Sequence, residues 1–168
     1  MDSRLGDDGA MTPDPPALRI APEDPATAEI VALICDAETF SARLYPAESN
    51  HHLPLDALRG AAVRFLVARD EADRAVGIGA VALHGDWAEI KSMWVVEAAR
   101  GRGVAGRILD RLVALAAEAG ASVVRLETGV ASHAALALYA RFGFRRRAPF
   151  ADYRDDPLSV FLERSLAG

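Results

Sequence analysis

The spacing of apolar residues changes once in the middle of the chain, from the period of a strand to the period of a helix. Residues 87–95 alternate, which predicts a strand with Ala88, Ile90, Ser92 and Trp94 on one face and Glu89, Lys91, Met93 and Val95 on the other. From Gly103 the apolar residues recur every three or four positions, at Val104, Ile108, Leu112 and Leu115, which predicts an amphipathic helix. A turn over residues 97–103 therefore joins the strand to the helix.

The remaining elements are predicted from the same patterns and from the Gly and Pro residues that interrupt them. Strands are expected at 17–21, 63–69, 76–84, 122–128, 144–148 and 159–163, and helices at 24–45, 54–60 and 132–142. Polar turns at 70–74 and 85–86 make three consecutive strands an antiparallel meander. The helix after Gly103 is a crossover, so strand 122–128 should run parallel to strand 87–95.

Length and composition indicate one globular domain. The chain has 168 residues, 51% of them hydrophobic, which suffices for one core and not for two comfortable ones. Residues 1–16 are rich in Gly, Asp and Pro and are expected to form a disordered tail, so the domain spans 17–168. An apolar signal-peptide core and long uncharged apolar runs are missing from the sequence, which favours a cytoplasmic protein.

The first predicted helix should contribute to this core. Its inward face is expected to carry Ile30, Leu33, Ile34, Ala37 and Phe40. The only cysteine, Cys35, lies in the same pattern, and a buried packing role is favoured over a nucleophilic one.

The turn between the central strand and helix has the composition of a phosphate-binding loop. Gly101, Gly103 and Gly106 let backbone N–H groups approach a ligand closely, and the helix N-terminus adds unpaired donors. Three arginines, at positions 100, 102 and 107, surround the loop in a chain whose formal net charge is −5. This local basicity on an acidic background predicts a small anionic ligand and argues against nucleic acid.

Two kinds of protein could use such a loop. Residues 101–106 fit the G-x-G-x-x-G pattern of an NAD-binding Rossmann fold, and Glu127 follows about twenty residues later. However, some eighty residues precede the strand and four residues separate Val96 from Gly101, whereas a Rossmann turn follows its strand at once. Too little chain follows to build the other parallel strands.

The second kind fits better. The segment Arg100-Gly101-Arg102-Gly103-Val104-Ala105 resembles the Arg/Gln-x-x-Gly-x-Gly/Ala signature of the GNAT superfamily of acetyl-CoA-dependent N-acetyltransferases. Residues 138–144, LYARFGF, are similar to a second GNAT signature at the usual distance. The segments RLETG at 125–129 and PFADYRDDPLSVFLE at 149–163 further resemble a bacterial subgroup that includes the YsnE-like proteins.

This resemblance implies an α/β (α+β) GNAT fold: a mixed central sheet of six to seven strands, about four helices, and two central parallel strands that splay apart. Acetyl-CoA (coenzyme A) would enter the gap, against backbone groups of Met93, Trp94 and Val95. The diphosphate would lie on the loop, with the cofactor-binding set Arg100, Gly101, Arg102, Gly103, Val104, Ala105, Gly106 and Arg107. Many relatives bond the pantetheine arm with an Asn where this chain has Ser132.

Acetyl transfer to an amine needs a base for the ammonium proton, a donor for the oxyanion and a proton for the departing thiolate. The resemblance places Tyr139 beside the thioester sulfur as this acid, although an amphipathic helix would also bury an ordinary tyrosine here. Glu89 matches the base of the histone-acetylating branch. Glu89 could equally pair with Lys91 or lie exposed.

The acceptor should meet the first helices, the loop at 45–53 and the strand end at 127–128. Candidate contacts are Glu38, Tyr45, Glu48, Glu127 and Thr128, of which the carboxylates would attract a cationic amine or remain solvated surface charges. The adjacent His51 and His52 lack a third ligand at a supporting spacing, so a loop or substrate contact is favoured over a metal site.

Three functions remain under comparison at this point. The first is an N-acetyltransferase acting on the amine of a small molecule or an amino-acid-like acceptor by direct attack. The second is a non-catalytic sensor that binds acyl-CoA, and the third is the NAD-dependent enzyme. The expected partners are a small-molecule amine and, as in many relatives, a second copy in a homodimer, with neither nucleic acid nor membrane.

Overall fold

A computed structural model describes residues 17–166, and the disordered tail expected at 1–16 lies outside the described residues. The elements follow one another as β1 (Arg19–Pro22), α1 (Ala28–Leu44), α2 (Leu55–Leu58), β2 (Val63–Arg69), β3 (Ala75–Leu83), β4 (Trp87–Val95), α3 (Val104–Glu118), β5 (Val123–Gly129), α4 (His133–Arg141), β6 (Arg145–Arg147) and β7 (Ser159–Ser165). Two 3-10 turns, Ala47–Ser49 and Glu97–Ala99, lie in the connections. The predicted order of helices and strands is confirmed.

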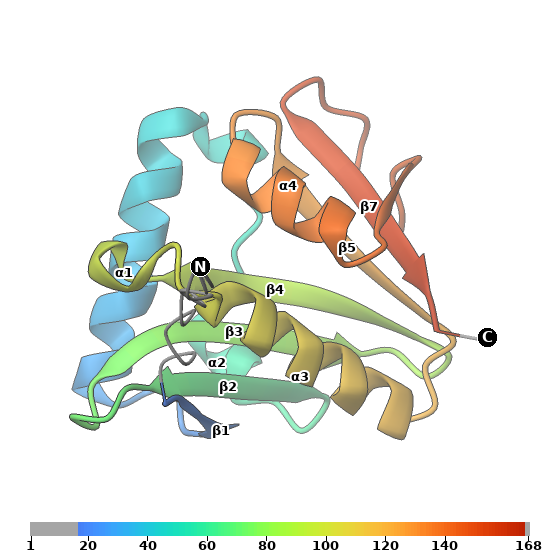
Figure 1. The fold of residues 1–168 in the computed structure, drawn as a ribbon. Helices are drawn as coiled ribbons and strands as arrows, with labels where there is room; N and C mark the ends of the chain where they lie inside the picture. The colour runs from blue at the N-terminus through green and yellow to red at the C-terminus, as the bar shows by residue number, and fades with distance from the viewer. Residues whose placement is uncertain (1–16, 167–168) are drawn as a thin grey trace, which may run out of the picture.

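The strands form one mixed sheet in the order β1-β2-β3-β4-β5-β7-β6 (Figure 1). All neighbouring strands are antiparallel except β4 and β5, which are parallel as the crossover through α3 requires. Their pairing begins at Trp87 with Val123 and ends at Glu89 with Arg125. Beyond this pair the two strands diverge, so the predicted splay is present at the centre of the sheet.

The core lies on both faces of the sheet. On one face, α3 and α4 cover a cluster that includes Leu66, Val81, Ile108 and Leu112. On the other face, α1 and α2 cover a smaller cluster around Ile30 and Ile78 (Figure 1). The two helices that follow the central strands therefore lie opposite the two helices that connect β1 to β2.

Two glycines of β3 let α3 approach the sheet closely. A Cβ atom added to Gly79 would lie 2.7 Å from Ile108 Cγ2 and 2.7 Å from Met93 Sδ. At Gly77 it would lie 2.8 Å from Ile108 Cδ1. Because these distances are shorter than any van der Waals contact, positions 77 and 79 exclude larger residues and allow α3 to pack closely on the sheet.

A β-bulge in β4 makes the predicted face assignment wrong for the end of this strand. Ala80 of β3 pairs with Lys91, but Ile78 pairs with Trp94, so β4 contains one extra residue between them. Ser92 carries the irregularity with a φ of 58°. Glu89, Lys91 and Trp94 consequently face α1, whereas Met93 and Val95 face α3.

Two predictions for α1 are also wrong. Ile30 and Leu33 are buried as expected, but Phe40 is 43% exposed and Cys35 is exposed. Helix periodicity marks one face along the whole length of α1, but the buried residues of this helix, Ile30 and Leu33, lie in its first half. Phe40 does meet the sheet, with its ring centre 5.4 Å from that of Trp94 in β4, but this contact leaves much of the Phe40 ring exposed.

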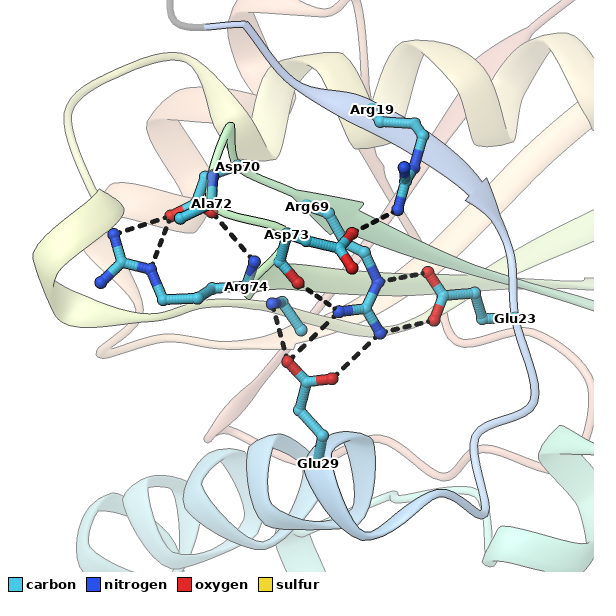
Figure 2. A network of polar contacts seen from close by, with 9 residues as sticks. Arg19, Glu23, Glu29, Arg69, Asp70, Ala72, Asp73 and Arg74 are labelled. Carbon is cyan, nitrogen blue, oxygen red and sulfur yellow. Dashed lines mark hydrogen bonds and ion pairs between the residues drawn. The ribbon is translucent and has the colours of Figure 1, made fainter.

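An ionic network fastens the start of α1 to the β2–β3 hairpin (Figure 2). The guanidinium of Arg69 donates to both carboxylate oxygens of Glu23, at 2.8 Å each, and to Glu29 Oε2 at 3.0 Å. It also donates to the carbonyl of Asp73 at 2.7 Å. The N–H of Ala75 and the Arg69 guanidinium hold the pKa of Glu29 below its usual value of 4.5.

We expect Arg69→Met to lower the free energy of unfolding by about 2 kcal/mol, because several charge-assisted hydrogen bonds are lost from a side chain that is 13% exposed. Arg74→Met is the matched control, since the Arg74 side chain is 77% exposed and should contribute less. The Glu29 contribution is present above its unfolded pKa and is lost as the pH falls through the lowered folded pKa. Urea unfolding should therefore show a smaller Arg69→Met effect in acid, and equal losses from both variants would contradict this assignment.

Candidate active site

The loop between β4 and α3 has the geometry of an anion-binding cradle. Gly101 and Gly103 have φ angles of 76° and 78°, values that favour glycine, and an added Cβ at either would meet nothing within 4 Å. Gly103 is the N-cap of α3 and offers no side chain to the helix. The N–H groups of Val104 and Ala105, in the first turn, lack an intrahelical acceptor and can serve an anionic ligand.

Not all residues of the loop have the same role. A Cβ on Gly106 would lie 3.0 Å from the ring of Phe142, so this glycine permits close packing of α3 against α4. The Arg100 side chain turns back toward the sheet, where Nε donates to the Val95 carbonyl at 3.0 Å and the guanidinium lies 4.8 Å from the centre of the Trp94 ring. Arg102 is exposed beside the cradle. Arg100 therefore places its charge on the sheet side of the loop, and Arg102 places its charge on the exposed side.

The end of β4 next to the loop presents backbone to the gap. Because pairing with β5 stops at Glu89, Met93, Trp94 and Val95 have no partner strand on that side among the described residues. Their carbonyl and N–H groups can bond an extended polar chain as a neighbouring strand would. The family expectation for these three residues is consistent with this arrangement.

Tyr139 lies in α4 and is 5% exposed. Its ring packs edge-on against Phe144, with ring centres 5.7 Å apart. Burial raises the pKa of the Tyr139 phenol well above its usual value, and the charge of Glu127 raises it further. The phenol therefore keeps its proton at neutral pH, as a proton donor must.

Glu89 is engaged in a buried network. The Tyr153 hydroxyl donates to Glu89 Oε1 at 2.5 Å, and the Lys91 ammonium lies 3.5 Å from the same oxygen. Lys91 also donates to the Tyr153 hydroxyl and to the His51 carbonyl, both at 2.8 Å. This network supports the alternative in which Glu89 pairs with Lys91.

Glu127 has a different environment. It follows Arg125, the last residue of β5 that pairs with β4, and faces the same side of the sheet as Glu89. Burial raises the pKa of Glu127 above its usual value, although the neighbouring Ser159 hydroxyl and the charges of His51 and Lys91 partly oppose this effect. Glu127 and Tyr139 interact electrostatically, so a raised carboxyl pKa and a protonated phenol occur together where β4 and β5 separate.

The other residues expected to contact the acceptor are more scattered. Glu38 and Glu48 are exposed, and Glu38 affects the pKa of His52. Thr128 is half-buried at the end of β5. Tyr45 is buried, and its hydroxyl lies 3.1 Å from Ser132 Oγ. Among residues 17–166, no group of three or more His, Cys, Asp or Glu side chains is arranged to hold a metal ion.

Sequence reasoning did not single out Tyr153. This residue lies in the connection between β6 and β7 and reaches back to β4 to bond Glu89. The connection is also attached to the 45–53 loop, where the Ser49 hydroxyl donates to Asp156 Oδ2 at 2.6 Å. Only the resemblance of residues 149–163 to a subgroup of relatives marked this segment, and that pattern carries no information on which strand Tyr153 contacts.

Comparison with known proteins agrees with this architecture. Residues 26–144 match the Acetyltransferase (GNAT) family, and the chain belongs to this family. It is therefore a GNAT-type acyltransferase, and its cofactor is acetyl-CoA. The NAD-binding interpretation is wrong, because the glycine loop joins β4 to α3 inside a GNAT sheet.

Two curated relatives are similar over nearly their whole length. The chain is 43% identical to an IAA acetyltransferase of Azospirillum brasilense over 153 residues, which cover 90% of this chain and 99% of the relative. It is 35% identical to the uncharacterized N-acetyltransferase YsnE of Bacillus subtilis (strain 168), with coverage of 89% and 100%. The resemblance to YsnE-like proteins is confirmed.

Solved structures show the same fold. The crystal structure of an acyl-CoA N-acyltransferase from Klebsiella pneumoniae superposes with a TM-score of 0.76 at 35% identity, over 89% of this chain and 97% of the other. A GNAT acetyltransferase from Elizabethkingia anophelis, solved with acetyl-CoA bound, has a TM-score of 0.63 at 17% identity, over 89% and 98%. Within residues 17–166, none of the helices is long and apolar enough to cross a membrane.

We expect Gly103→Ala to weaken coenzyme A binding by at least about tenfold, because a Cβ at positive φ strains the loop by about 1–2 kcal/mol and shifts its N–H groups. Gly85→Ala is the matched control: Gly85 has a φ of 82° with nothing within 4 Å, but lies in the β3–β4 turn. Calorimetry should show a loss of affinity for Gly103→Ala alone, while both variants lose similar thermal stability. Equal coenzyme A affinities would contradict the cradle assignment.

Proposed function

We propose that the protein transfers the acetyl group of acetyl-CoA to the amine of a small molecule or amino-acid-like acceptor, by direct attack within a ternary complex. The observation that carries the proposal is that Glu127 of β5 and Tyr139 of α4 lie near enough to interact electrostatically where β4 and β5 separate, and that burial raises the pKa of the carboxyl and keeps the phenol protonated. Such a pair can accept one proton and donate another at neutral pH. The names of the curated relatives as acetyltransferases support the same reaction class.

Glu127 is the better candidate for the base. An alkyl ammonium has a pKa of about 10, so its proton must pass to a carboxylate or to water held by one. Glu89 already accepts a hydrogen bond from Tyr153 and lies beside the ammonium of Lys91. No salt bridge to Glu127 is found within residues 17–166, so its charge remains available to attract a cationic amine.

Tyr139 acts at the other end of the reaction. Bound acetyl-CoA supplies an activated thioester, and its departing sulfur needs a proton. The Tyr139 phenol is buried and protonated, so it can donate this proton and later recover one from solvent or substrate. Backbone groups of 93–95, the 102–107 loop and Ser132 would hold the cofactor, and Arg100 would support the loop from the sheet side.

In this proposal the acceptor binds on the α1 side of the sheet. Glu89, Lys91 and Trp94 face this side, and Glu127 joins them from β5. Tyr45, Glu38 and Glu48 come from α1 and the loop that follows it, and Thr128 closes the end of β5. We retain the expectations of one domain over 17–168, a cytoplasmic location and a homodimer as parts of this proposal.

We expect Glu127→Gln to lower kcat/KM by about a hundredfold or more and to remove the limb of the pH profile that rises with pH. The sign follows from the raised pKa of Glu127: the free base forms as the pH rises through a value above 4.5. Glu89→Gln is the matched comparison, expected to lose stability but to keep the rising limb. Both variants are assayed by the release of free coenzyme A across a range of pH with a panel of amines. If Glu89→Gln loses the rising limb and Glu127→Gln keeps it, Glu89 is the base.

We expect Tyr139→Phe to lower kcat by about a hundredfold or more with little change in coenzyme A affinity, because only the thiolate loses its proton donor. Calorimetry and turnover measured on one preparation separate the two effects. Unchanged turnover would remove Tyr139 from the mechanism.

If the wild-type protein binds acetyl-CoA but releases no thiol with any amine of a broad panel, the sensor function replaces the enzyme.

A further inference from the structure

The end of α1 is joined to the start of α4 by one buried phenol. Tyr45, the C-cap residue of α1, is 9% exposed. Its hydroxyl accepts a hydrogen bond from the Ala131 N–H at 3.0 Å and lies 3.1 Å from Ser132 Oγ, a bond in which either oxygen can be the donor. The contact spans 86 and 87 positions of the chain.

The backbone of β5 is shaped to receive this ring. A Cβ atom on Gly129, the last residue of β5, would lie 1.9 Å from the Tyr45 hydroxyl and 2.0 Å from Cζ. A side chain at position 129 is therefore incompatible with the observed place of the phenol. Two hydrogen bonds and this close approach together define the position of Tyr45.

The Ser132 side chain bonds Tyr45 and does not cap α4. Ser132 is the N-cap of α4, and a serine there usually bonds the N–H groups of the first turn, which stabilises a helix by about 1 kcal/mol. Ser132 makes no such bond. Its hydroxyl, which has one proton and two lone pairs, is instead oriented by Tyr45 and retains capacity for two further hydrogen bonds.

The position of Ser132 on α4 indicates what this partner is. Ser132 precedes Tyr139 by seven positions, or about two turns, so both residues lie on the same side of the helix about 10 Å apart. If Tyr139 lies at the thiol end of the cofactor, as proposed, Ser132 would be within reach of the amide groups of the pantetheine arm. An amide can donate to or accept from an oriented hydroxyl.

We propose that Tyr45 is a positioning residue for the cofactor: it orients the Ser132 hydroxyl toward an amide of the pantetheine arm. This inference rests on the proposed function. Tyr45 thereby moves from the expected acceptor contact to a residue that acts through Ser132. It also connects the cofactor arm to α1 and the 45–53 loop, on the side of the sheet where the acceptor is placed.

The test is a double-mutant cycle read by calorimetry with coenzyme A. Tyr45→Phe keeps the ring on Gly129 and removes only the hydroxyl, and we expect the dissociation constant to rise about five- to tenfold. Ser132→Ala, which leaves the Ala131 bond to Tyr45 intact, should raise it by a similar factor. The double variant should be no worse than either single one, because both remove the same contact.

A purely structural role for Tyr45 gives a different result. In that case Tyr45→Phe lowers the melting temperature without changing coenzyme A affinity, or the two losses of affinity multiply in the double variant. Either result overturns the inference. Ser132→Asn provides a second check, since the asparagine amide can bond the arm directly. In this background Tyr45→Phe should hardly change the affinity for coenzyme A.

The Leu44→Ala control and the wild-type protein distinguish a failure of this inference from a failure of the proposed function. Leu44→Ala changes the neighbouring residue, which is 42% exposed, and should leave coenzyme A affinity unchanged. A wild-type protein that gives no heat with coenzyme A would overturn the proposed function together with this inference. A wild-type protein that binds and turns over, with Tyr45→Phe binding equally well, would overturn only the role of Tyr45.

Discussion

The divergence of β4 and β5 is the constraint on which the rest of the structure depends. The two central strands are joined only from Trp87 to Glu89, and their carboxyl ends leave backbone groups without a neighbouring strand. Unpaired backbone groups are unfavourable unless water or a ligand satisfies them. The glycine loop stands at the end of β4, so the polar strand edge and the anion cradle form one continuous surface for a long ligand with a charged end.

Side chains from the connecting segments bridge the two halves of the sheet where the strands do not. Tyr153 reaches from the β6–β7 connection to Glu89, and the Ser49 hydroxyl bonds Asp156 of the same connection. Tyr45 joins the end of α1 to the β5–α4 corner. The segments that hold the halves together are therefore also the segments that we propose to enclose the acceptor, and the proposal couples acceptor preference to stability.

The sequence predicts those features that local periodicity and turn chemistry determine. The order of elements, the parallel pair and the glycine loop follow from apolar spacing and from Gly101 and Gly103. The splay, and the acid role that we propose for Tyr139, are implied by the family resemblance and not by periodicity. Features that depend on tertiary contacts were not predictable: the exposure of Phe40 depends on how much of its ring Trp94 covers, and the bond of Tyr153 to Glu89 depends on the path of a loop.

The extra residue at Ser92 means that chain length, more than side-chain chemistry, determines which way the end of β4 faces. Without the bulge, the same residues in simple alternation would turn the side chains of Met93, Trp94 and Val95 to the opposite faces of the sheet. Trp94 would then face α3 and Met93 would face α1, with the amino-acid composition of the strand unaltered. The way in which β4 accommodates one surplus position therefore decides which of its side chains share a face with Glu89 and Lys91.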